Sequence, residues 1–267
     1  MPNNPSDTVI VAVNAANTRL NGRVDTLQPI GGQLIGNTQS FSQQVVNDAW
    51  RKMQNRLADA RYSGLQQETL FAAVPAASST DPALQVNISF SGYFDGMNLL
   101  SVPVLPAGFI QPYELTERQN GTTNLFTEMD QIFFSLPKVP KQNWNREWLW
   151  RSNAIYLPGA LVSTDIFLLY AGLLVDFQDG ALPWFQQPIP ILNSIDCLAD
   201  YICREIEIAR GNAAGAMAFQ QSAEDGARLI CNQNSSGPKS IYKTSEFGKM
   251  QDRFTPNSGA DTEAVKR

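Results

Sequence analysis

Proline divides this sequence into segments that can and cannot form long helices. Eleven of the 16 prolines fall between Pro75 and Pro190, and none occurs from residue 30 to 74 or from 191 to 237. Proline has no backbone N–H, and its ring clashes with the preceding turn inside a helix. We therefore expect the long helices in the two proline-free segments, with other structure between them.

The first proline-free segment contains an amphipathic helical pattern from Ser40 to Tyr62. Its apolar residues recur at spacings of three and four, at Val46, Trp50, Met53 and Leu57. Ser40 followed by Gln43 matches a capping box, and Gly64 is expected to end the helix.

The second proline-free segment predicts two helices, at 193–210 and at about 213–232, separated by Gly211-Asn212. Asn193 or Ser194 is expected to cap the first helix. Its apolar face comprises Ile195, Leu198, Ile202, Ile206 and Ala209. The second helix has an apolar face of Ala216, Phe219, Ala223, Ala227 and Ile230, whose small members predict close contact between helices.

Between these segments the apolar period changes to two, which is typical of strands. "VNISFSGYF" at 86–94 alternates as one strand, and Asp95-Gly96 after it predicts a hairpin turn. Further strands are expected at 113–118, 148–157 and 164–177, with Pro158-Gly159 turning the chain between the last two.

These elements predict an α+β fold in which an antiparallel β domain is inserted into a small helical bundle. Because a lone amphipathic helix is marginal in water, the helix at 40–62 should pack on the later helical hairpin. The expected domains are an N-terminal extension at 1–39, a bundle at 40–72 and 191–232, a β domain at 73–190 and an extended tail at 233–267.

Composition excludes several classes of function. The chain of 267 residues has a formal net charge of −5, which argues against nucleic-acid binding through a basic face. The most apolar run, 166–177, is 12 residues long, whereas a membrane helix needs about 20. We expect no signal peptide, because residues 1–13 lack a basic region and a long apolar core. We therefore expect no membrane association.

The sequence contains no histidine, which removes the usual general base, the usual zinc ligand and any histidine-activated nucleophile. Cys197, Cys203 and Cys231 form no CxxC pair and are expected to be reduced, core-filling residues. Phosphate-loop, dinucleotide and nucleophile-elbow motifs are also absent from the sequence. We expect no metal, no cofactor and no catalytic residues.

Two carboxylate pairs, Glu114 with Glu117 and Asp176 with Asp179, are formal candidates for glycoside hydrolysis. Nothing in their surroundings distinguishes them from solvated charges. A hydrolase is therefore the weakest of the functions considered.

Three tryptophans, Trp144, Trp148 and Trp150, fall within seven positions. Trp148 and Trp150 are two apart in a predicted strand, so both rings leave the same face. That face is either the core of the β domain or a platform for sugar stacking, and we interpret it as core. Trp144 lies in a predicted loop. The expected core comprises Trp50, Trp148, Trp150, Ile195, Leu198, Ile202 and Phe219.

The tail at 233–267 is polar, and its aromatic residues are too isolated to form a core of their own. It is either without a role or a segment that becomes ordered on a partner. Its candidate anchors are Ile241, Tyr242, Phe247, Met250 and Phe254.

Six segments in this order resemble the head-to-tail connector or adaptor proteins of tailed phages, the head-completion and tail tubular A-like proteins. They are "VNDAWRKMQNRLADA" at 46–60, "SGYFDG" at 91–96, "VLPAGFIQPYELTERQNG" at 104–121, "MDQIFFSLP" at 129–137, "WLWRSNAIYLPGALVSTDIFLLY" at 148–170 and "CLADYICREIEIARGN" at 197–212. The resemblance covers residues 40 to 232, and residues 1–39 extend beyond it.

The resemblance implies a virion structural protein rather than an enzyme. About twelve copies would form a ring beneath the portal protein at the virion neck, after assembly in the host cytoplasm. The ring would extend the channel through which genome DNA passes without sequence-specific binding, and would bind the next neck or tail component. The C-terminal segment would dock on the portal. The alternative is a carbohydrate-binding or other tail component that uses Trp144, Trp148 and Trp150.

Overall fold

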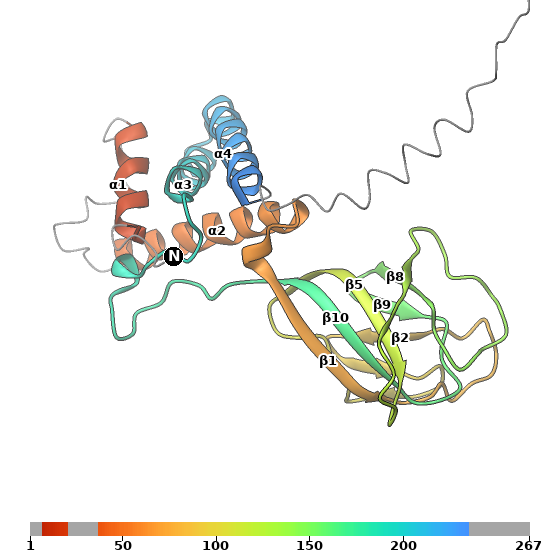
Figure 1. Ribbon diagram of the computed structural model, residues 1–267. Coiled ribbons are helices and arrows are strands. Elements are labelled where there is room, and N and C mark those ends of the chain that lie inside the picture. Colours follow the sequence, from red (N-terminus) through yellow and green to blue (C-terminus); the bar gives the residue numbers. More distant parts are fainter. Residues whose placement is uncertain (1–6, 21–36, 235–267) are drawn as a thin grey trace, which may run out of the picture. The chain divides into compact units, whose positions relative to one another are not determined.

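The computed structural model describes residues 7–20 and 37–234, and side chains within this part except those of 37–42 and 234 (Figure 1). The chain divides into two compact units, Met1–Cys231 and Asn232–Arg267. Within the described residues the fold is mixed α+β, with four helices and two mainly antiparallel sheets. The helices are α1 (Val9–Arg19), α2 (Asn37–Asp59), α3 (Ile195–Ala209) and α4 (Ala213–Asn234). None of them has the length and apolar character that crossing a membrane requires.

All described strands lie between α2 and α3 in the sequence. The four-stranded sheet has the order β1 (Gln66–Val74), β10 (Thr164–Gly172), β5 (Phe109–Gln119), β6 (Thr127–Glu128). The six-stranded sheet has the order β4 (Leu99–Leu100), β3 (Gly92–Phe94), β2 (Val86–Ser89), β9 (Ala154–Leu157), β8 (Glu147–Arg151), β7 (Asp130–Gln131). Only the pairing of β7 with β8 is parallel. Short 3₁₀ turns lie at Ser63–Leu65 and Trp184–Gln186.

The described side chains form two apolar cores. One core unites the helices with the segment after β10 and contains Trp50, Leu198 and Ile202, with Ile195 and Phe219 packed at its margin. The other lies between the two sheets and contains Trp148, with Trp150 at its margin. The chain enters and leaves the sheets through neighbouring strands, because Gln66 at the start of β1 pairs with Ala171 near the end of β10 (Figure 1).

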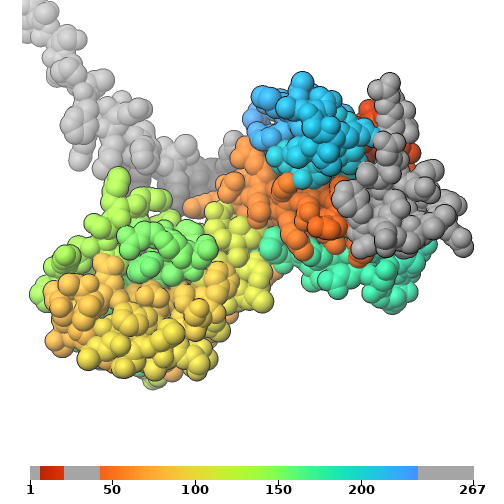
Figure 2. All heavy atoms as spheres, turned by 180° about the vertical axis from the view of Figure 1, so that it is seen from behind, coloured from red at the N-terminus to blue at the C-terminus, as the bar shows by residue number. Residues whose placement is uncertain are grey.

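Helix α2 packs against α3 (Figure 2). It begins at Asn37, three residues before the expected start. Its end is also different, because Arg61, not Gly64, adopts the left-handed conformation, with φ of 56°. The Tyr62 amide donates to the Leu57 carbonyl, and the Arg61 amide donates to that of Ala58, which is a Schellman motif.

Helices α3 and α4 follow their predicted boundaries closely. Gly211 takes a φ of 74° after α3, and Asn212 Oδ1 accepts a hydrogen bond from the Gly215 amide at the start of α4. The small residues of α4 allow the predicted close approach, since the Cys197 thiol lies 3.3 Å from the Ala223 carbonyl oxygen. Ser194 occupies the N-cap of α3, but its hydroxyl donates to the Ile191 carbonyl instead of capping the helix.

Helix α1 corrects the assignment of residues 1–39 as a plain N-terminal extension. Val9, Ala12, Val13 and Ala16 are buried in the helical core, and α1 packs on α3. Arg19 at its end forms ion pairs with Asp196 and Asp200 of α3. The physical reason is tertiary: eleven residues form a stable helix here because α3 covers their apolar stripe.

Two segments expected to be single strands are hairpins. The predicted strand 86–94 divides into β2 and β3, and 148–157 divides into β8 and β9 at Ser152-Asn153, with φ of 50° and 58°. Two successive positive φ values are typical of the tight turn that matches strand twist. The predicted turn at Asp95-Gly96 is confirmed between β3 and β4. The predicted strand 164–177 ends at Gly172, and the residues after it run along α2.

Position 92 requires glycine, because the backbones of β3 and β4 lie very close together there. Its φ is 133°, and a Cβ built there would lie 2.1 Å from the Leu100 carbonyl oxygen. We therefore expect Gly92→Ala to lower the free energy of unfolding by about 2 kcal/mol or more, because strain and a backbone clash add together. Urea denaturation measures this loss for Gly92→Ala and for Gly121→Ala, a control position with positive φ and open space around it. The difference between the two losses gives the contribution of the backbone clash. Equal losses in both variants would contradict the clash.

Candidate functional site

The three clustered tryptophans occupy different environments. Trp148 is buried in β8, and its Nε1 donates a 3.2 Å hydrogen bond to the Met129 carbonyl. Trp150 is partly buried on the same core, with its ring centroid 5.2 Å from that of Phe109. A ring enclosed like that of Trp148 has no free face, so it does not belong to a sugar-stacking platform. Trp144, in the segment between β7 and β8, is partly exposed.

A buried carboxylate anchors the backbone next to Trp144. Glu117 of β5 accepts hydrogen bonds from the amides of Asn145 (2.9 Å) and Arg146 (2.7 Å) and from the Asn145 side chain (3.2 Å). Asn145 Oδ1 in turn accepts a hydrogen bond from the Gly159 amide. Arg146 is thereby held at a φ of 59°, which is strained for a residue with a side chain. The segment is therefore fixed before any partner arrives.

Two surface hollows flank Trp144. One has a volume of about 190 Å³, and its lining combines the apolar residues Pro137, Val139, Pro140, Trp144 and Pro158 with the polar residues Lys141, Gln142, Asn145, Arg146 and Glu147. The other has a volume of about 150 Å³ and is lined by Glu117, Thr127, Glu128, Trp144 and Arg146. Trp144 and Arg146 border both hollows.

Lys141 lines the hollow of about 190 Å³ as a buried cation. Its Nζ donates a 2.9 Å hydrogen bond to the Leu84 carbonyl. Burial lowers the pKa of Lys141, while the nearby carboxylates of Asp81 and Asp95 act in the opposite direction. The side chain thus joins the hollow to the loop before β2, which is a structural role.

The lowered pKa of the Asp95 carboxyl group predicts that the protein loses stability in acid. Burial would raise its pKa, but hydrogen bonds from Ser78, Asn98 and Met97 lower it to about 2. Because the folded pKa is below the unfolded value of about 3.9, this stabilisation is complete above that value and disappears as the pH falls to about 2. We expect Asp95→Asn to lower the free energy of unfolding by at most about 2 kcal/mol at pH 6 and by little at pH 2. Urea denaturation across this range measures it, and a pH-independent difference would contradict it.

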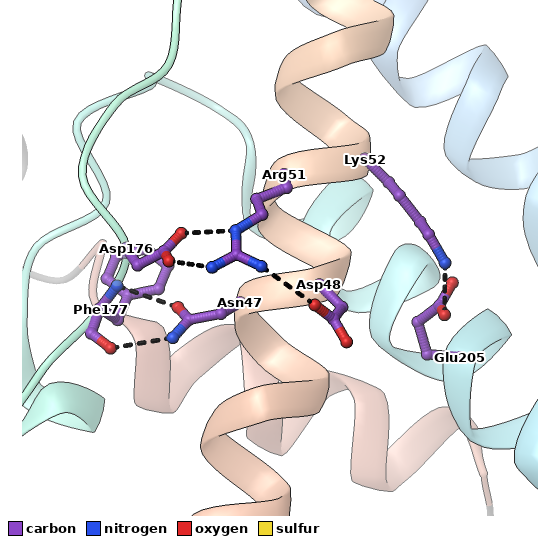
Figure 3. A network of polar contacts seen from close by, with 7 residues as sticks. All are labelled: Asn47, Asp48, Arg51, Lys52, Asp176, Phe177 and Glu205. Carbon is purple, nitrogen blue, oxygen red and sulfur yellow. Dashed lines mark hydrogen bonds and ion pairs between the residues drawn. The ribbon is translucent and has the colours of Figure 1, made fainter. Parts of the chain in front are cut away.

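Helix α2 holds four consecutive residues of the chain after β10, and Figure 3 shows the contacts to two of them, Asp176 and Phe177. The amide of Leu174 donates to Gln54, and the carbonyl of Val175 accepts from Trp50. Arg51 pairs with Asp176 through two nitrogens, and the hydrogen bond to this carboxylate raises the pKa of Arg51. Asn47 both donates to and accepts from the backbone of Phe177. Lys52 forms a 2.5 Å ion pair with Glu205 of α3.

Large apolar side chains are exposed at both edges of the six-stranded sheet. At the β4 edge, the exposed fractions are 65% for Met97, 62% for Leu99 and 65% for Val102. In the β7–β8 segment, residues 132–146, they are 75% for Phe133 and 90% for Phe134. Exposed Leu125 lies between β5 and β6, and Met217 and Leu229 are exposed on α4. Sequence reasoning missed these surfaces, because alternation alone does not tell an edge strand from a central one.

The candidate carboxylate pairs serve structural roles or lie apart. Glu114 is exposed and Glu117 buried, on opposite faces of β5. Asp176 binds Arg51, and Asp179 accepts a hydrogen bond from the Trp184 amide. Within residues 7–20 and 37–234, no group of histidine, cysteine, aspartate or glutamate side chains is arranged to hold a metal ion. Cys197, Cys203 and Cys231 are free thiols, the first two buried.

The remaining predicted site residues divide by location. The candidate portal-docking residues lie outside the described part of the chain, namely Ile241, Tyr242, Phe247, Met250 and Phe254. Among the expected core residues, Trp50, Trp148, Leu198 and Ile202 are buried, while Trp150, Ile195 and Phe219 are partly buried.

No protein-family model matches this chain, and no curated protein matches it.

Proposed function

We propose that this protein is a head-to-tail connector of a tailed phage. About twelve copies would form a ring beneath the portal, extend the DNA channel and offer an attachment site to the tail. The observation that carries the proposal is the exposure of large apolar side chains at both edges of one sheet and on α4. Contiguous exposed apolar surface marks sites where other proteins bind.

A ring needs two different contact surfaces on every copy, because a heterologous contact closes only by rotation. The two edges of the six-stranded sheet are such a pair, since they consist of different residues. The surface of α4 with Met217 and Leu229 is left for another component. The finer architecture that we propose is a helical bundle with an inserted β domain, in which α2 holds the returning chain at Leu174–Phe177.

The charge of the chain also supports a channel. A net charge of −5 suits a lumen past which DNA moves, because an acidic wall does not bind phosphates. We propose that DNA passes without sequence-specific contacts and that the segment 233–267 docks on the portal.

The test is the mass of the purified full chain with and without the portal protein of the same phage. We expect a monomer or weak oligomer alone and a ring with portal, measured by light scattering and negative-stain electron microscopy. Replacing Tyr242, Phe247 and Phe254 by serine should abolish portal binding, whereas Ser235→Ala should not. A chain that remains monomeric with portal would overturn the proposal.

Carbohydrate binding is a second candidate, favoured by the partly exposed indole of Trp144 between two hollows. Aromatic faces beside polar groups stack on sugars, and Arg146 and Glu128 supply such groups. Titrating glycans against tryptophan fluorescence tests it, with Trp144→Ala as the variant that should lose the response. A response unchanged in Trp144→Ala would exclude this site.

A further inference from the structure

We propose that neighbouring copies of this chain bind edge to edge through the six-stranded sheet. The β4 edge of one copy, residues 97–104, lies against the β7–β8 segment, residues 132–146, of the next copy. This inference rests on the proposed function, and it names the surfaces that form the ring.

The β4 edge is an uncharged apolar surface of the kind that another protein covers. Residues 97–104, "MNLLSVPV", contain no charged side chain, so they bring no unpaired charge into a contact. Exposed edge strands are usually protected from pairing with another chain by a lysine side chain, by a covering helix or loop, or by being very short. Here β4 is short, but Met97, Leu99 and Val102 are each more than 60% exposed. β4 pairs antiparallel with β3, and the backbones approach so closely that only glycine fits at Gly92 opposite the Leu100 carbonyl.

The opposite edge offers a complementary surface. Phe133 and Phe134 are exposed in the β7–β8 segment, and the hollow of about 190 Å³ lies mainly in the same segment. Its apolar wall of Pro137, Val139 and Trp144 can contact aliphatic side chains such as those of the β4 edge, while its polar residues would form the rim of the contact. Glu117 fixes the backbone of this segment at Asn145 and Arg146, so little conformational freedom is lost beside Trp144 when a second copy binds.

The sheet order decides the type of contact. β4 and β7 are the two outermost strands of one sheet, so a copy that uses both edges contacts two different neighbours. Such a contact is heterologous and generates a ring or a filament, whereas a two-fold dimer would need the same edge on both partners.

The exposed apolar surface can be compared with the area that a stable interface buries. An aromatic side chain presents on the order of 150–250 Å², and the two edges together present roughly 800 Å² of apolar side-chain surface. A stable interface buries about 1,200–2,000 Å² in total, including backbone and polar rim. The two edges thus supply about half of a standard interface.

Pairwise cross-linking of two variants, each with one introduced exposed cysteine, tests the proposal, since the remaining Cys197 and Cys203 are buried. In a full chain carrying Cys231→Ser, Leu99→Cys and Phe134→Cys are made separately, mixed, and treated with a short bis-maleimide at increasing protein concentration. We expect the mixed 99–134 product to exceed the 99–99 and 134–134 products at least tenfold. Met217→Cys in place of either residue serves as the matched exposed control and should give background yield. Circular dichroism confirms that each variant is folded.

Either predominance of like-with-like products or no product above the Met217→Cys background up to millimolar concentration would overturn the edge-to-edge contact. The two proposals fail separately. A 99–134 product without portal binding would support this contact and oppose the connector function. A ring on the portal without the 99–134 product would support the connector function and oppose this contact.

Discussion

Replacing Trp148 by alanine is expected to lower the free energy of unfolding by about 3–5 kcal/mol. The side chain is 1% exposed, in the core between the two sheets, and its Nε1 satisfies the Met129 carbonyl. Alanine would leave a large cavity and a buried carbonyl oxygen that loses this donor. Urea denaturation followed by far-ultraviolet circular dichroism measures the loss without depending on tryptophan fluorescence.

Trp144→Ala is the matched control, because it removes the same type of side chain from a partly exposed position in the β7–β8 segment, just before β8. We expect this variant to lose less than about 1 kcal/mol. Similar losses in Trp148→Ala and Trp144→Ala would contradict the division of the tryptophans into a core residue and a surface residue.

Replacing Glu117 by alanine is expected to lower the free energy of unfolding by about 3–5 kcal/mol. The buried carboxylate accepts from two backbone amides and one side-chain amide, and each buried donor left unsatisfied costs about 1–3 kcal/mol. The strained backbone of Arg146 loses its anchor at the same time. Hydrogen exchange should therefore accelerate at the amides of Asn145 and Arg146 under conditions where the protein remains folded.

Glu114→Ala provides the control for this variant, since Glu114 is an exposed carboxylate on the same strand. Its stability and the exchange of the Asn145 amide should stay close to those of the unmodified chain. If Glu117→Ala leaves exchange at Asn145 and Arg146 unchanged, another group fixes the Trp144 segment. The edge-to-edge contact would then lose its argument from a pre-formed surface.

The helices were largely predictable because helix formation depends on neighbours three and four residues apart. α3 and α4 match their expected limits because apolar spacing and Gly211-Asn212 are local features. α1 was missed although Val9, Ala12, Val13 and Ala16 have helical spacing. Its run of β-branched residues has low intrinsic helix propensity, and the stabilising surface comes from α3, far away in the sequence.

The sheet was predictable in content but not in pairing. Alternation located the strand-forming residues, but the interpretation as one strand passed over the turn at Ser152-Asn153. The inward positions change there from Trp148 and Trp150 to Ile155 and Leu157, so the phase of the alternation shifts by one residue across the turn. The structural roles of the buried carboxylates of Glu117 and Asp165 were missed for another reason, which is distance in the sequence. Their partners, such as Asn145 for Glu117 and Ala73 for Asp165, lie tens of residues away.

The sequence by itself determined the class of fold, the location of three helices, the strand-rich middle and the lack of histidine chemistry, because these depend on local spacing and composition. Only the tertiary structure decided which tryptophan is exposed, which strands are edges and where buried acids anchor the backbone. Edges and burial are properties of strand order, and strand order is set by contacts between residues far apart in the chain.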